Sequence, residues 1–109
     1  MHIALALVTL ALSSATCGTP GQRAAITAAV KAHQPGAMVS TITIAGDYAD
    51  ATVIRFGDIP RDMLLAKRGG AWKTLASSGS AYDLGGLERA GIPLGVAARL
   101  WKELSSGAC

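Results

Sequence analysis

Residues 63–77, MLLAKRGGAWKTLAS, carry the clearest secondary-structure pattern in the chain. Two short runs with strand-forming residues, 63–67 and 71–77, flank the pair Gly69 and Gly70. Two adjacent glycines can both adopt the positive φ that a type I′ turn requires, and this turn joins neighbouring antiparallel strands. The pattern therefore predicts a β-hairpin.

Two further strands are expected upstream, at residues 38–45 and 48–56. Both segments mix Val, Ile and Phe with Thr, which are residues that favour strands. Gly46 and Asp47 form the turn between them, and residues 57–60 form a second turn. The four strands follow one another along the chain, so we expect an antiparallel meander.

A helix is predicted before the first strand. Thr19 suits the N-cap, Pro20 the first turn, and Gln22 the third position of a capping box. Its apolar stripe has helical spacing and comprises Ile26, Ala29, Val30 and His33. Residues 35–36, Pro-Gly, end the helix.

After the hairpin, the serines and glycines of residues 77–86 predict a flexible stretch that holds Tyr82 and Leu84. Pro93 then suits the start of a short C-terminal helix. The stripe of that helix comprises Ala97, Leu100, Trp101 and Leu104. The fold class is thus α+β, with the N-terminal helix packed on one face of the sheet. We expect that face alone to be buried.

Residues 3–12, IALALVTLAL, are apolar but too short to span a membrane. Small residues follow, and Ser13 with Ala15 permits cleavage after Ala15. We expect residues 1–15 to be a signal peptide and 16–109 to be a single small domain. The segment before residue 3 contains no Lys or Arg. The alternatives are that residues 3–12 belong to the folded domain, or that Cys17 carries a lipid anchor.

Two cysteines, Cys17 and Cys109, remain after such cleavage. Export to an oxidising compartment predicts a disulfide between them. In the chain-entropy model such a long loop stabilises the fold by roughly 4 to 5 kcal/mol. The alternatives are two separate thiols or an intermolecular bridge.

Three motifs extend this interpretation: GDYA at residues 46–49, LLAKRGGAWK at 64–73 and GIP at 91–93. With them the chain resembles small exported bacterial proteins of unassigned function, in which a helix packs on a four-stranded sheet in a cystatin-like manner. It is distantly similar to NTF2-like proteins, whose longer sheet and extra helices enclose a pocket. The resemblance implies the fold and export, and it assigns no catalytic residue.

The sequence contains few residues in patterns typical of catalysis or metal binding. His33 is the one histidine beyond the expected leader and suits the last turn of its helix. The serines at 77, 78 and 80 form no nucleophile elbow, and Asp58 and Asp62 fit solvated turn positions. We expect no catalytic, cofactor or metal site, and no ligand-binding residue is assigned. The aromatic residues are expected mainly in the core: Tyr48, Trp72, Tyr82 and Trp101.

The distribution of charge argues against a nucleic-acid-binding protein. The formal net charge is +3, and the basic residues are scattered among acidic ones, so no patch for nucleic acid is expected. The sequence favours a secreted or periplasmic, non-catalytic binding or inhibitory module that acts on another envelope or secreted protein. The alternatives are a structural or accessory envelope protein and, less favoured, a small hydrolase. No transmembrane anchor is predicted, and a small-molecule ligand stays unassigned.

Overall fold

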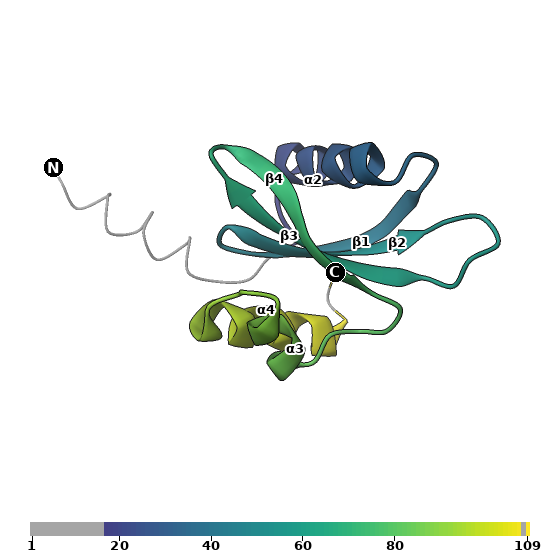
Figure 1. Cartoon of the computed structure of the whole chain (residues 1–109). Helices are drawn as coiled ribbons and strands as arrows, with labels where there is room; N and C mark the ends of the chain where they lie inside the picture. Colours follow the sequence, from purple (N-terminus) through teal and green to yellow (C-terminus); the bar gives the residue numbers. More distant parts are fainter. Residues whose placement is uncertain (1–16, 108) are drawn as a thin grey trace, which may run out of the picture.

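The computed structural model describes residues 17–107 and residue 109. The expected signal peptide, residues 1–15 with cleavage after Ala15, lies outside the described residues. Within them, the elements follow in the order helix, four strands and two helices (Figure 1). The predicted α+β class, with its N-terminal helix and four-stranded antiparallel meander, is confirmed.

The first helix, α2 (Pro20–His33), begins with the predicted capping box. The Gln22 backbone N–H donates to Thr19 Oγ1 at 3.1 Å, and the Thr19 N–H donates to Gln22 Oε1 at 2.9 Å. Both bonds satisfy N–H groups that lack a partner within the helix. Ile26 and Val30 are fully buried, whereas His33, expected on the same stripe, is exposed in the last turn.

The sheet has the strand order β1-β2-β3-β4, and every neighbouring pair is antiparallel. The strands are β1 (Met38–Ala45), β2 (Tyr48–Ile54), β3 (Arg61–Arg68) and β4 (Ala71–Ser78). Gly69 and Gly70, between β3 and β4, have φ values of 59° and 80°. Glycine adopts this left-handed region without steric cost, so the predicted hairpin is confirmed.

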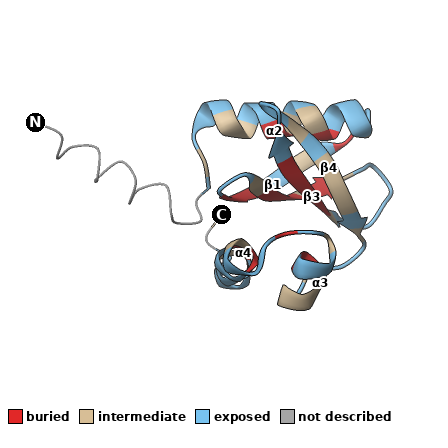
Figure 2. Cartoon of the chain, turned by 60° about the vertical axis from the view of Figure 1, so that its left-hand side comes forward, coloured by how far each residue is buried: buried red, intermediate tan, exposed pale blue. Residues whose placement is uncertain are grey.

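Helices cover both faces of the sheet, and the expectation of a single buried face is wrong. In Figure 1, α2 lies on one face, and α3 and α4 lie on the other. Two buried clusters result, which include Ile26, Val30, Ala51, Met63 and Leu65 under α2, and Ala45, Leu64, Leu87, Ala97 and Leu100 under α3 and α4. Figure 2 shows the buried residues on the strands and on the sides of the helices that face them.

The second cover consists of α3 (Leu84–Arg89) and α4 (Leu94–Ser106). Part of the stretch that we expected to be flexible is therefore helical. The Gly86 backbone N–H donates to Asp83 Oδ1 at 2.7 Å, which caps α3. Leu100 is fully buried, but Trp101, expected on the same stripe, is 42% exposed.

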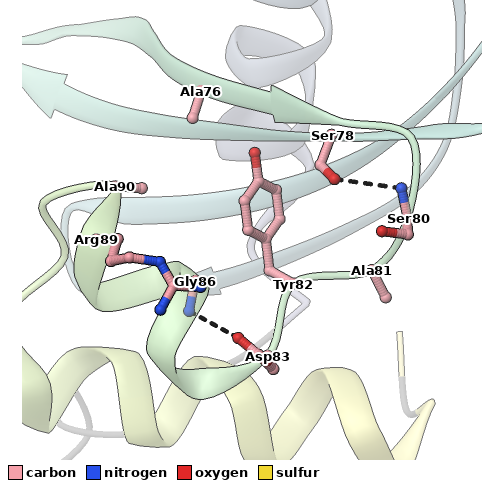
Figure 3. Close-up of a pocket in the computed structure, with 9 residues that line it drawn as sticks. All are labelled: Ala76, Ser78, Ser80, Ala81, Tyr82, Asp83, Gly86, Arg89 and Ala90. Atoms are coloured by element: carbon pink, nitrogen blue, oxygen red, sulfur yellow. Dashed lines mark hydrogen bonds between the residues drawn. The ribbon is translucent and has the colours of Figure 1, made fainter.

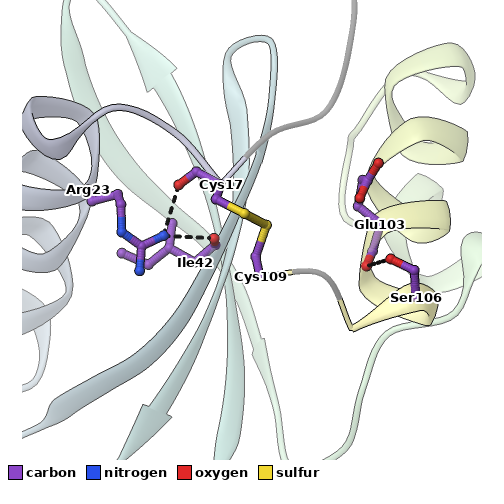
Figure 4. The surroundings of a disulfide bond; sticks show 6 residues. All are labelled: Cys17, Arg23, Ile42, Glu103, Ser106 and Cys109. Carbon is purple, nitrogen blue, oxygen red and sulfur yellow. Dashed lines mark hydrogen bonds between the residues drawn. A yellow bond between two sulfur atoms is a disulfide. The ribbon is translucent and has the colours of Figure 1, made fainter.

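The predicted disulfide joins Cys17 to Cys109, with their Cα atoms 5.4 Å apart (Figure 4). Arg23 of α2 holds Cys17 near strand β1. Its Nη1 donates to the Cys17 carbonyl at 2.8 Å and to the Ile42 carbonyl at 3.2 Å. The disulfide therefore ties the segment before α2 to the segment after α4.

Strand β2 ends two residues before its predicted end, so the loop between β2 and β3 begins earlier than expected. Strand β2 ends at Ile54, and Phe56, expected at the end of that strand, lies fully exposed in the loop. Within the described part of the chain, no helix has the length and hydropathy of a membrane span.

Candidate functional site

A groove of about 460 Å³ opens between the end of β4 and helix α3 (Figure 3). It is lined by Ala76, Ser78, Ser80, Ala81, Tyr82, Asp83, Gly86, Arg89 and Ala90. Strand β4 is the last strand of the sheet, and among the described residues no strand pairs with its outer edge. Such an edge offers backbone N–H and C=O groups to an extended segment of another chain.

The segment between β4 and α3 gives the groove its shape. The Ser80 backbone N–H donates to Ser78 Oγ at 3.3 Å, and the Asp83 cap fixes the first turn of α3. Tyr82, between them, is half-buried and packs on the core under α3 and α4. In Figure 3 its hydroxyl points toward the sheet. The groove is thus built from hydrogen-bonded turns and one anchored ring.

Arg89 supplies the positive charge of the groove. Its side chain lies beside Gly86, and its Nη1 is 3.1 Å from where a Cβ on Gly85 would stand. Among the described residues, Arg89 has no hydrogen-bond or ion-pair partner for its guanidinium group. An exposed guanidinium presents a fork of N–H donors that matches a carboxylate.

A second polar feature is a pair of carboxyl groups on the face of the sheet that α3 and α4 cover. Asp50 is only 2% exposed and lies in the middle of β2, opposite Thr43 on β1 and Leu64 on β3. Asp62 precedes Leu64 by two residues on β3, so strand alternation places Asp62 on the same face as Asp50. Asp50 carries no sequence signal that predicts a site, and Asp62, predicted at a solvated turn, lies instead on strand β3. The β2–β3 register brings the two together.

Burial dominates the chemistry of this pair. Together with the charge of Asp62 and a hydrogen bond with Asp62, it raises the pKa of Asp50 to about 8. Burial also raises the pKa of Asp62, while the hydrogen bond with Asp50 lowers it. The raised pKa of Asp50 therefore favours its protonated form near neutral pH. Burial, together with the charges of Asp50 and Asp62, raises the pKa of Tyr82 as well.

A smaller pocket of about 240 Å³ lies beside Asp62, between the sheet and the end of α4. Its lining residues come from three strands, α4 and the disulfide: Thr41, Thr43, Thr52, Asp62, Ala81, Glu103, Leu104, Gly107 and Cys109. Ala81 lines both this pocket and the groove, so the two hollows lie on either side of the segment that carries Tyr82.

The serine, histidine and aspartate residues considered from the sequence do not lie together as a nucleophilic site. Ser78 and Ser80 line the groove, whereas His33 belongs to α2, which covers the opposite face of the sheet. Asp58 is exposed in the β2–β3 loop. Among the described residues, no group of three His, Cys, Asp or Glu side chains is arranged to hold a metal ion.

Large exposed apolar side chains mark one end of the sheet. Phe56 is fully exposed, Met38 is 68% exposed and Ile59 is 69% exposed. Met38 pairs with Ile54 at the start of the β2–β3 loop, which carries the other two residues. Isolated exposed apolar residues are common on protein surfaces, so these three do not define a binding site by themselves.

Comparison with known proteins gives one partial relationship. The chain is 37% identical over 87 aligned residues to the UDP-N-acetylenolpyruvoylglucosamine reductase of Mycolicibacterium gilvum (strain PYR-GCK). The match covers 72% of this chain but 24% of the reductase, so the chain spans about a quarter of that relative's length. No family model matches the chain. No solved structure matches it.

Proposed function

We propose that the chain is an exported, non-catalytic binding or inhibitory module that holds an extended segment of another envelope or secreted protein in the groove between β4 and α3. The observation that carries the proposal is the groove itself, which runs beside an unpaired strand edge. An added strand would gain main-chain hydrogen bonds, and the groove would supply the selectivity. The resemblance to small exported proteins with a cystatin-like domain belongs to the same proposal.

Arg89 sets the expected chemistry of the partner. An exposed guanidinium without a partner among the described residues favours a segment that carries a carboxylate. Tyr82 adds a ring with a polar end, which suits recognition surfaces. The partner segment is therefore expected to be extended and to place an acidic group beside α3.

The disulfide supports an extracytoplasmic location, because such bonds persist in oxidising compartments. It also occupies the Cys17 sulfur atom that a lipid anchor would need. This favours release into the periplasm or medium over anchoring through Cys17.

The test is site-specific photo-crosslinking of the disulfide-intact protein in the native envelope or medium. A photoreactive residue at position 80, in the groove, should give a saturable adduct with one extracytoplasmic protein, and one at position 31, on the exposed side of α2, should not. Arg89→Glu should reduce the adduct at least tenfold. Arg99→Glu, the same charge change on the exposed side of α4, should leave it unchanged.

The outcome separates this proposal from its alternatives. Equal adducts from both positions, or equal yields from the two arginine variants, would contradict a groove-specific partner. Repeated absence of any adduct would instead favour a structural or accessory envelope protein. Turnover of a substrate by the purified domain would favour the small hydrolase.

A further inference from the structure

The smaller pocket beside Asp62 carries an inference that is independent of the groove. Its polar lining consists of hydrogen-bond acceptors and hydroxyl groups: Asp62, Glu103, Thr41, Thr43 and Thr52. No Lys, Arg or His lines it. Acidic groups come from both sides, because Asp62 belongs to the sheet and Glu103 to α4. The pocket therefore suits a ligand that is positively charged and rich in N–H donors.

A buried carboxyl group that neighbours two of the lining residues provides a second observation. Asp50 is 2% exposed, and among the described residues no donor reaches its Oδ2 atom. Its neighbours on this face, Thr43 and Asp62, both line the pocket. Buried polar atoms almost always have a partner, so an atom without one points to a bound proton or a bound donor.

A metal ion is the less suitable occupant. Mg²⁺ or Ca²⁺ needs several oxygen ligands gathered around one point. In the described part of the chain, the acidic side chains form no such group of three. An ammonium group can instead bond acceptors that lie apart, and Leu104 and Ala81 offer apolar contact for a short alkyl stem.

We propose that this pocket binds a primary ammonium group, with Asp62 and Glu103 as the two anionic contacts and Asp50 as a positioning residue behind Asp62. The pair can hold either a proton or the bound cation. Binding of the ammonium group then releases that proton to solvent. Because the pKa of Asp50 is raised, a proton on that carboxyl weakens the negative charge available to the cation, and Tyr82 and Arg61 are the other titratable or charged groups near the pair.

The first test is an NMR titration of the disulfide-intact protein with n-butylammonium chloride, with sodium chloride at matched ionic strength as the reference. Saturable shifts are expected at the backbone amides of Thr43, Thr52 and Asp62, with a dissociation constant on the order of 1 mM. n-Butanol, which has the same stem without the charge, should give none. Absence of a saturable shift beyond the sodium reference would overturn the proposal.

Variants separate the contact from the positioning residue. Asp62→Asn should weaken binding at least tenfold, whereas Asp58→Asn, the same change in the exposed β2–β3 loop, should not. Binding to the wild type should tighten from about pH 6 to about pH 9, and Asp50→Asn should remove most of that dependence. The dispersion of the amide spectrum shows whether each variant is folded.

Two further ligands complete the test. Calcium chloride that shifts the same amides at lower concentration than butylammonium would overturn the choice of an ammonium group in favour of a metal. A short acetylated and amidated peptide with a single Lys distinguishes the source of the cation. Tighter binding of that peptide than of butylammonium supports a lysine side chain presented by a protein, and weaker binding supports a free amine.

Discussion

Asp50 has a strongly raised pKa, which makes the stability of the fold depend on pH. It lies buried in the middle of β2, and its pKa is raised to about 8, mainly by burial. The unfolded chain exposes the same carboxyl, which then titrates at its ordinary value of about 3.9. At a pH between these two pKa values, the folded state thus holds a proton on Asp50 and the unfolded state does not.

This extra proton in the folded state makes the free energy of unfolding depend on pH. A group whose pKa is raised on folding stabilises the protein at low pH, and this stabilisation is lost as the pH rises toward the folded-state pKa. The free energy of unfolding should therefore fall between about pH 4 and about pH 8, by at most about 1.4 kcal/mol per pH unit for one proton. Urea unfolding across this range measures it. Asp50→Asn should flatten the dependence, and Asp58→Asn should keep it; equal slopes in wild type and Asp50→Asn would contradict this account.

Phe56 illustrates the opposite case, a large apolar residue without burial. It is fully exposed in the β2–β3 loop, so Phe56→Ser removes no packing and should change the free energy of unfolding by less than about 0.5 kcal/mol. Leu64→Ala, at a fully buried position, should cost about 2 to 5 kcal/mol. Urea midpoints of the two variants provide the measurement. A large loss from Phe56→Ser would show that the loop packs on the domain in solution.

Helix α2 depends on local sequence at its start and on the sheet for its burial. The Thr19 and Gln22 capping box forms as their spacing predicts. Ile26 and Val30 then anchor the helix in the core cluster that β1, β2 and β3 line. The cap determines where the helix begins, and the core determines which side faces inward.

Thr19→Ala should destabilise the protein by about 1 kcal/mol, because the Gln22 N–H loses its acceptor at the helix start. Thr27→Ala is the matched control, since the same change inside the helix removes no cap. Thermal unfolding followed by circular dichroism should separate the two variants by several degrees. Equal midpoints would mean that water replaces the cap at no cost.

Helices α3 and α4 cover the second face of the sheet, so both of its faces are buried. β3 contains four consecutive buried apolar residues, Met63 to Ala66, of which Leu64 packs under α3 and α4 while Met63 and Leu65 pack under α2. A continuous apolar run is typical of a strand buried on both faces. That pattern is present in the sequence and could have predicted the second cover.

Over the whole molecule, the disulfide links the two ends of a thin, two-sided core. It joins residues separated by 92 positions in the sequence. Arg23 adds two hydrogen bonds at the same corner. The bridge therefore restricts the unfolded chain strongly while it adds little to the core itself.

Replacing both cysteines, Cys17→Ser with Cys109→Ser, should lower the free energy of unfolding by about 2 to 5 kcal/mol. Reduction of the wild-type protein should lower it by a similar amount, which controls for the serines. Urea unfolding of the oxidised, reduced and double-serine proteins provides the comparison. An unchanged midpoint after reduction would contradict a stabilising role for the bridge.

The sequence by itself determined the first helix, the four strands, the last helix and the disulfide between the ends of this protein, but not helix α3. Glycines at 69 and 70, the cap at Thr19 and the alternating strand residues are local signals, because each acts through backbone conformation or neighbouring hydrogen bonds. The cysteine pair followed from composition and expected compartment.

Only the tertiary structure decided what lies on the second face. Asp50 and Asp62 are 12 positions apart in the sequence, and the β2–β3 register, together with the cover of α3 and α4, turns them into a buried pair. The groove likewise needs β4 and α3 to lie opposite each other. These features depend on which surfaces are removed from water, and no single segment of the chain carries that information.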